Sequence, residues 1–302
     1  MIITSRDIVR QFLFLEVTMG FKEDLERFNK NHKVKTINIK GNKFNYLLSG
    51  KGEKKVVFFT GGSGLYEGFY KHIELLEKKY NVLAFDYPIG IKNVYDLVNS
   101  IADLLNSLNF NKCFLIGESV GGLLLQLFIK QKSEMVEGGV LVNTGVINKS
   151  TSYDMKKEVV DGIKSVIRTV QTTPAFILKP AIIKKSVKKI KEDFEGSIDS
   201  IYAKEYVSYF IEKIDKEKAI SVCNIALNFV ESISFHKEDF KEISNRVTII
   251  STNDDEVFDE RSKAELKKLF INSKNKYIKS GGHASFLFKY DEYISMLDEI
   301  II

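Results

Sequence analysis

The stretch CFLIGESVGG, residues 113–122, decides the fold of this chain. Its first four residues are apolar and predict a buried strand, and the apolar residues after it predict a helix. Ser119 stands between them, with Gly117, Gly121 and Gly122 around it. Small residues on both sides of a serine allow a sharp turn in which the strained serine projects its hydroxyl outward. The stretch is therefore either a tight strand-to-helix turn that happens to contain a serine, or a turn that exposes this serine for chemistry.

The alternation of strands and helices continues along most of the chain. Continuous apolar runs at 56–59, 82–85 and 140–142 are separated by helix-like stretches. Such runs are typical of strands buried on both faces, and their alternation with helices predicts crossover connections in a parallel sheet. Before them, alternating apolar and polar residues around Gly41 and Asn42 predict a β-hairpin.

This rhythm is interrupted once. From Asn148 to about Ile233 no convincing strand is present, and the segment is helical in pattern, with Pro174 and Pro180 expected to break it. We therefore predict an α/β fold, with a mostly parallel eight-stranded sheet flanked by helices and a helical lid inserted after the sixth strand. The predicted division is a core formed by 1–147 and 236–302 and a lid formed by 148–235.

Side chains that could carry out chemistry follow three of the predicted strands, where the sites of open parallel sheets form. Ser119, Asp255 and His283 each come just after an apolar run. A serine hydroxyl is a weak nucleophile and needs an adjacent base, for which histidine has a suitable pKa, and a carboxylate orients the imidazole. Asp254 is the alternative to Asp255 as the acid.

With these residues in view, the chain resembles the α/β hydrolases. The resemblance rests on the G-x-S-x-G motif at 117–121, between a strand and a helix, and on the chain order serine, aspartate, histidine. It covers nearly everything after residue 34. It implies a serine hydrolase with nucleophile Ser119, general base His283, an acid after the seventh strand, and an oxyanion hole formed by the backbone N–H groups of Val120 and Gly62. No metal or organic cofactor is needed for this chemistry.

Three departures from the family pattern leave other functions open. Thr60 stands where the family usually has histidine before glycine. The Tyr87-Pro88 form of the loop after the fourth strand resembles the maspardin-like branch, in which catalysis cannot be assumed. The glycines after the third strand are similar to those of proline iminopeptidases.

The predicted function is the cleavage of a carboxylic ester or a similar acyl bond. One alternative is a maspardin-like binding module without catalysis. The other is a proline iminopeptidase-like aminopeptidase, which would need a lid carboxylate to hold a substrate ammonium, and the candidates are Glu192, Asp193 and Glu195.

Other ionisable side chains are given structural roles. Asp86 is expected to brace loops, and Glu118 to hydrogen-bond within the turn that holds Ser119. His72 is expected to face outward from its helix. The basic stretch 179–191 has apolar residues at helical spacing. It is therefore a lid helix that covers the site, a membrane-surface helix, or an ordinary amphipathic helix with a solvated lysine face.

The composition argues against several other classes of protein. The 45 Lys and Arg barely exceed the 40 Asp and Glu and are dispersed, which is not typical of nucleic-acid binding. Cys113 and Cys223 match no metal spacing and imply no disulfide framework. No apolar run reaches the roughly 20 residues of a membrane helix, and residues 1–20 are expected to form an amphipathic helix or an ordered arm rather than a signal peptide. We expect a cytoplasmic protein that binds a small acyl substrate, with no nucleic acid and no stable membrane insertion; the oligomeric state is left open.

Overall fold

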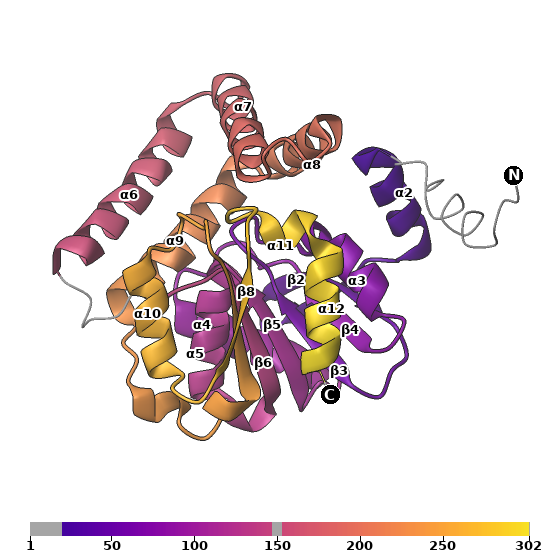
Figure 1. Ribbon diagram of the computed structural model, residues 1–302, viewed down its shortest axis with the longest axis vertical. Helices are drawn as coiled ribbons and strands as arrows, with labels where there is room; N and C mark the ends of the chain where they lie inside the picture. The colour runs from indigo at the N-terminus through magenta and orange to yellow at the C-terminus, as the bar shows by residue number, and fades with distance from the viewer. Residues whose placement is uncertain (1–19, 147–152, 302) are drawn as a thin grey trace, which may run out of the picture.

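An eight-stranded sheet forms the centre of the computed structural model, which describes residues 20–146 and 153–301 (Figure 1). The strand order is β1-β2-β4-β3-β5-β6-β7-β8. The first two strands form the predicted antiparallel hairpin, and the remaining six run parallel to one another. The strands are β1 (Lys35–Ile39), β2 (Asn42–Ser49), β3 (Lys55–Phe59), β4 (Asn81–Phe85), β5 (Cys113–Glu118), β6 (Val136–Val142), β7 (Val247–Thr252) and β8 (Lys274–Ile278).

Helices cover both faces of this sheet. The α-helices among the described residues are α2 (Phe21–Asn31), α3 (Tyr70–Leu76), α4 (Val94–Ser107), α5 (Val120–Gln131), α6 (Tyr153–Thr172), α7 (Ala175–Asp193), α8 (Ser200–Lys213), α9 (Lys216–Ser232), α10 (Glu260–Leu269), α11 (Ser285–Phe288) and α12 (Tyr290–Ile300). Apolar side chains of α4, α5, α9 and α10 pack into one core, and those of α2, α3, α8 and α12 pack into the other. The predicted fold class is confirmed.

The central strand β5 shows why continuous apolar runs form these strands. All of its residues are buried. Cys113 and Leu115 belong to the core on one face of the sheet, while Phe114 and Ile116 belong to the core on the other. Successive side chains of a strand point to opposite faces, so a strand covered by helices on both sides needs apolar residues at every position.

Four helices, α6 to α9, lie between β6 and β7 in the chain, and α7 and α8 lie over the end of the molecule at which α11 begins (Figure 1). They differ in how firmly they are attached. Phe229 of α9 and Phe210 of α8 are buried in the two cores, whereas Phe176, near the start of α7, is 78% exposed. The helical insertion is thus anchored by α8 and α9.

Some expectations fall outside the described residues. The predicted arm at 1–20 lies outside them except for Gly20, and so does the predicted boundary at 147/148. The division of the chain into a core and a lid therefore remains a prediction. Within the described ranges, none of the helices has the length and apolar character that a bilayer crossing requires.

The expected break at Pro180 is wrong. Pro174 does precede the first residue of α7, but the helix continues through Pro180 to Asp193. A proline inside a helix removes one backbone hydrogen bond and crowds the preceding turn. The loss is tolerated here because this part of α7 is exposed, so that water can bind the freed carbonyl.

The expectation that His72 faces outward is also wrong. His72 is 1% exposed, and its ring stacks on Phe286 with the ring centroids 4.1 Å apart. It lies on the inner face of α3, where α11 covers it. Burial lowers the pKa of His72 from 6.5 to about 3, because the charged imidazolium would lose its hydration.

This shift predicts a specific dependence of stability on pH. Between pH 6.5 and about pH 3 the unfolded chain takes up a proton at His72 that the folded protein refuses. The free energy of unfolding should therefore fall by up to about 1.4 kcal/mol per pH unit as the pH drops through this window. Urea unfolding from pH 7.5 to 4.5 measures how the free energy of unfolding changes with pH. In a His72→Phe variant this change should be smaller than in the wild type, by an amount that corresponds to the uptake of nearly one proton. Replacing the exposed His236 by Phe is the matched control, and equal slopes in the two variants would contradict the assignment.

Candidate active site

Ser119 lies at a strained turn between β5 and α5. Its backbone angles are φ 54° and ψ −119°, a conformation that non-glycine residues rarely adopt. A Cβ at Gly121 would lie 2.0 Å from the carbonyl oxygen of Phe59, and one at Gly122 would lie 2.6 Å from the side chain of Thr144. The prediction that the glycines around Ser119 permit close packing is therefore confirmed.

The structure brings Ser119, His283 and Asp255 together from three strand ends. Nε2 of His283 lies 2.8 Å from Oγ of Ser119. Nδ1 of the same ring lies 3.0 Å from Oδ2 and 3.1 Å from Oδ1 of Asp255, whose side chain is fully buried. Each nitrogen of one imidazole thus faces a different partner, which is the arrangement that passes a proton from a hydroxyl to an oriented base.

Asp254, the alternative acid, is placed differently. Its carboxylate accepts hydrogen bonds from the backbone N–H groups of Gly281 and Gly282, at 3.1 and 2.9 Å. Both glycines have positive φ and directly precede His283. Asp254 therefore braces the loop that carries the histidine, while Asp255 contacts the ring itself.

The charges around His283 favour its protonated form. Burial alone would lower the pKa of His283, but the hydrogen bond with Asp255 and the charges of Glu118 and Asp255 together raise it above its usual value. The imidazole therefore accepts a proton more readily than a free histidine. The imidazolium that results lies between the carboxyl groups of Asp255 and Glu118.

The backbone donors predicted for an oxyanion hole have no acceptor among the described residues. Gly62 is exposed, and a Cβ there would meet no atom within 4 Å. Val120 is the first residue of α5, where a helix leaves its N–H groups free and its dipole favours negative charge. Both N–H groups are therefore available to an anion.

The departures at Thr60 and in the loop after β4 are linked. The hydroxyl of Tyr87 donates a hydrogen bond of 2.7 Å to the backbone carbonyl of Thr60. Asp86 accepts from the backbone N–H of Tyr66 at 3.0 Å, as expected of a residue that braces loops. Thr60 Oγ1 is buried with no hydrogen-bond partner among the described residues. The tyrosine thus holds in place the strand end from which the loop with Gly62 departs.

Asn143, at the end of β6, was given no role by the sequence. Its Nδ2 lies 3.3 Å from the carbonyl oxygen of His283 and 2.9 Å from Oγ of Ser285. Its Oδ1 accepts from both the N–H and the hydroxyl of Thr252, each at 2.9 Å. One buried amide therefore connects the end of β7, which leads to Asp255, to the loop of His283. A positive φ of 42° at a non-glycine residue is the signal, and it is visible only in the structure.

Replacing Asn143 by Ala should damage both the fold and the site. The change leaves the buried N–H of Thr252 without its acceptor and removes the hydrogen bond to the carbonyl oxygen of His283, which should lower the free energy of unfolding by about 2–4 kcal/mol. Chemical denaturation measures this loss, with Asn253→Ala, an exposed residue of the neighbouring loop, as the control. A loss no larger than that of the control would show that the network is not important.

The helical insertion contacts the loops that carry Asp255 and His283. Lys189 of α7 pairs with Asp193 and with Glu256, both at 2.9 Å. A Cβ at Gly282 would lie 2.2 Å from the carboxylate of Asp193. Of the three carboxylates considered for binding a substrate ammonium, Asp193 thus pairs with Lys189, Glu192 pairs with Lys188 and Glu195 is exposed.

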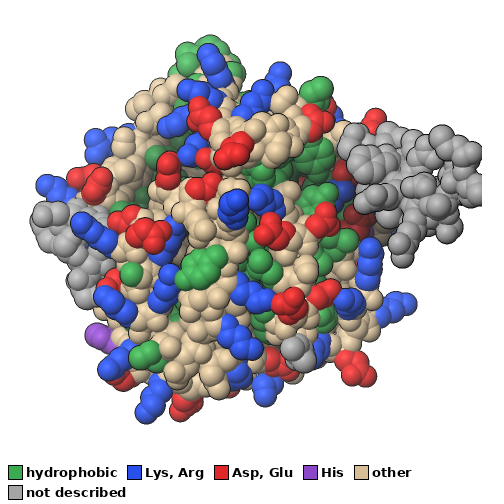
Figure 2. Space-filling model, in the orientation of Figure 1, with side chains coloured by type: hydrophobic (Ala, Val, Ile, Leu, Met, Phe, Trp, Pro, Cys, Tyr) green, Lys and Arg blue, Asp and Glu red, His purple; other side chains and the backbone are tan. Residues whose placement is uncertain are grey.

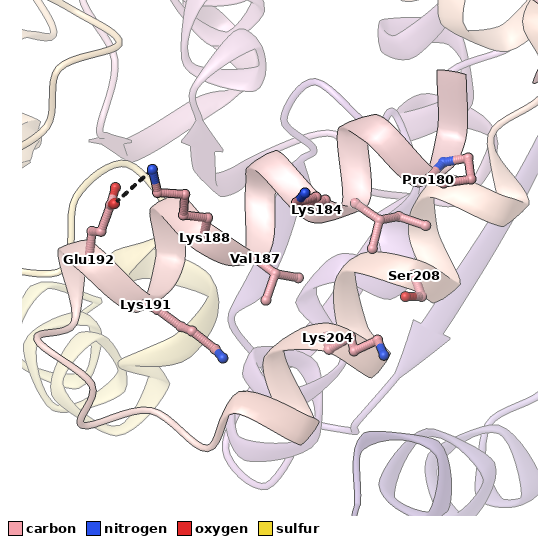
Figure 3. Close-up of a pocket in the computed structure, with 9 residues that line it drawn as sticks. Pro180, Lys184, Val187, Lys188, Lys191, Glu192, Lys204 and Ser208 are labelled. Carbon is pink, nitrogen blue, oxygen red and sulfur yellow. Dashed lines mark ion pairs between the residues drawn. The ribbon is translucent and has the colours of Figure 1, made fainter. Parts of the chain in front are cut away.

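A groove of about 840 Å³ lies between α7 and α8, outside the candidate site (Figure 3). Ile183 and Val187 line it, together with lysines of both helices. Ile190, the third residue of this apolar stripe, is buried, and Lys185 and Lys188 are exposed. Residues 179–191 thus form an amphipathic helix with a solvated lysine face. On the face of the molecule shown in Figure 2, basic and acidic side chains are interspersed.

The order of the eight strands and the sharp turn at Ser119 between β5 and α5 define the class of the protein: it has the α/β-hydrolase fold. Many solved structures share it, and two of them show the likeness. A bromoperoxidase from Bacillus anthracis is 17% identical, with a TM-score of 0.71 over 89% of this chain and 99% of that one. MGS-M2, an α/β hydrolase enzyme from a deep-sea metagenome library, is 17% identical, with a TM-score of 0.69 over 88% of this chain and 97% of that one.

The chain belongs to the Ndr family, whose model matches residues 77–253. It is also similar to maspardin from Danio rerio, at 24% identity over 77% of this chain and 69% of that protein. Human maspardin is 24% identical over 77% of this chain and 70% of that protein. The predicted resemblance to the α/β hydrolases, with maspardin-like features, is confirmed. The family match includes Ser119 and ends before Asp255 and His283.

Proposed function

We propose that this chain is a serine hydrolase that cleaves a carboxylic ester or a similarly activated acyl bond. The observation that carries the proposal is the continuous series of contacts from Oγ of Ser119 to Nε2 of His283 and from Nδ1 of His283 to Asp255. Three residues from distant parts of the chain meet in the geometry that activates a serine.

In the first half of the reaction, Oγ of Ser119 attacks the carbonyl carbon of the substrate and its proton passes to Nε2 of His283. The negative charge that develops on the carbonyl oxygen is stabilised by the N–H groups of Gly62 and Val120. The carbon–oxygen bond to the leaving group then breaks, and the leaving alkoxide takes the proton from Nε2. The product of this half is an acyl group on Ser119 and a free alcohol.

In the second half, water attacks the acyl carbon and gives its proton to Nε2 of His283. The bond to Oγ of Ser119 breaks, and the proton returns from Nε2 to Oγ. Asp255 keeps Nδ1 protonated throughout and stabilises the imidazolium in both halves. No cofactor takes part in these steps.

The proposed substrate is a small acyl compound. The insertion α6–α9 acts as the lid of this proposal, since α7 contacts the loops of Asp255 and His283 through Glu256 and Gly282. The aminopeptidase alternative receives less support, because Asp193 is already ion-paired.

The two free cysteines, Cys113 and Cys223, agree with a cytoplasmic location.

The second candidate function is a maspardin-like binding module that keeps the fold without catalysis. The similarity to maspardin over 77% of the chain favours it. It predicts a folded protein whose Ser119 is not activated, so the reactivity of this one hydroxyl distinguishes the two functions.

Labelling with a fluorophosphonate probe tests the proposal directly. The phosphorus should bond to Oγ of Ser119, because only an activated serine displaces fluoride from such a probe. Peptide mapping of the adduct should locate it on residue 119, and the Ser119→Ala variant and heat-unfolded protein should remain unlabelled. No adduct on the folded protein, with another serine hydrolase labelled in parallel, would favour the binding module.

The two neighbouring aspartates should differ sharply in an esterase assay with short acyl esters. Asp255→Asn should lower kcat by about 10³–10⁴-fold, because the histidine loses the partner that fixes its tautomer. Asp254→Asn keeps one acceptor for the loop of Gly281 and Gly282, and should cost about tenfold or less. The reverse order would move the acid to Asp254.

A further inference from the structure

Glu118, the residue before Ser119, has a buried carboxyl group inside the candidate site. The residue is 6% exposed. Its Oε1 lies 3.8 Å from Nε2 of His283, the nitrogen that faces Ser119. The expected hydrogen bond within the turn is not found, and His283 is its nearest partner of opposite charge among the described residues.

The chain makes room for this carboxyl group. A Cβ at Gly61 would lie 2.1 Å from Oε2 of Glu118, so no larger residue fits there without moving the carboxylate. Gly61 begins the loop that carries Gly62. The side chain of Glu118 is therefore held between the loop of the predicted oxyanion donors and the imidazole of His283.

We propose that Glu118 is a positioning residue of the hydrolytic site, whose carboxylate stabilises the imidazolium that forms when Ser119 gives its proton to Nε2 of His283. This inference rests on the proposed function and deepens it. At 3.8 Å in a buried site, a carboxylate acts strongly on an adjacent positive charge, because little water screens the interaction.

The electrostatics of the site agree with this geometry. Burial, and to a smaller extent the charge of Asp255, raise the pKa of Glu118 to about 7 against the opposing effect of His283. Burial raises the pKa of Tyr87, Tyr206 and Tyr293, and the charge of Glu118 adds to each increase.

Lys263, whose Nζ donates a hydrogen bond to the backbone carbonyl of Asp255, acts in the opposite direction. Lys263 lowers the pKa of His283, while Glu118 and Asp255 raise it. Glu118 therefore changes charge near neutral pH and in doing so changes the basicity of the histidine. The two groups titrate as a coupled pair.

The first test measures the pKa of His283 by NMR in protein with labelled histidine. The chain has only four histidines, and His283→Ala identifies the relevant signal. In Glu118→Gln the pKa of His283 should fall by about one pH unit or more, because the nearby negative charge is gone. Glu118→Asp keeps the negative charge but places it farther from the imidazole. The pKa of His283 in this variant should lie between those of the wild type and Glu118→Gln, and the variant replaces Glu118→Gln if that protein does not fold.

Glu67→Gln is the matched control for this measurement. Glu67 is also 6% exposed, but its carboxylate pairs with Lys213 of the insertion. The pKa of His283 should stay unchanged in that variant. An unchanged pKa in folded Glu118→Gln, or an equal fall in Glu67→Gln, contradicts the proposal.

The second test compares the pH profiles of kcat/KM for an ester. At low pH Glu118 is protonated and resembles glutamine, so the profiles of the wild type and Glu118→Gln should converge below about pH 6. Above pH 7 the variant should be slower by about tenfold, the counterpart of one pH unit in the pKa of His283. A deficit that is constant at every pH would indicate a merely structural role and overturn the proposal.

The two tests separate this inference from the proposed function. The NMR titration needs no turnover, so a fall in the pKa of His283 supports the placement of Glu118 even if no ester is hydrolysed. In that case the proposed function fails alone. Turnover with identical profiles for wild type and Glu118→Gln would support the hydrolase and refute the role of Glu118.

Discussion

The close approach of the start of α5 to the ends of β3 and β6 is the constraint on which the rest of the site depends. Gly121 touches the backbone of Phe59, and Gly122 touches Thr144. Any side chain at these positions would push α5 away from the two strands. The glycines therefore do more than permit a turn. They allow Ser119 to lie close to the strand ends from which the loop of Gly62 and Asn143 follow. The strain of the serine backbone costs about 1–3 kcal/mol, and the hydrogen bonds from Ser119 N–H to Val142 and from Thr144 to the Ser119 carbonyl oppose its release.

A second set of polar contacts fixes the acid and the base relative to each other. Asp254 accepts a hydrogen bond from the backbone N–H of Gly282, the residue before His283, and Asn143 donates one to the carbonyl oxygen of His283. Neither side chain touches Ser119. They fix the loop of His283 against the loop of Asp255. The 3.0 Å contact between these two residues therefore does not depend on their own side chains alone. Lys189 adds a weaker, exposed connection from the insertion.

The sequence predicted what depends on local pattern and missed what depends on burial. Strands such as β5 were predictable because a sheet covered on both faces demands continuous apolar runs, and the position of Ser119 because its glycines have a steric meaning. The burial of His72 was not predictable, since α11, which covers it, is distant in the chain. The continuation of α7 through Pro180 depends on solvent at one exposed turn. Asn143 and Glu118 act through partners more than a hundred residues away, and one polar side chain in a sequence does not reveal such partners.

Family membership and chemistry rest on different parts of this chain. The Ndr match covers 77–253 and thus the scaffold from β4 to β7, but Asp255 and His283 come after it. Solved structures of the same fold at 17% identity establish the scaffold alone, because one fold hosts many activities. The proposed hydrolysis therefore depends on the two contacts that His283 makes with Ser119 and Asp255. A binding module has no chemical use for an imidazole held between a buried carboxylate and a serine hydroxyl, and the strained backbone of Ser119 costs stability. The presence of that arrangement in a chain similar to maspardin is the reason to test the reactivity of Ser119 first.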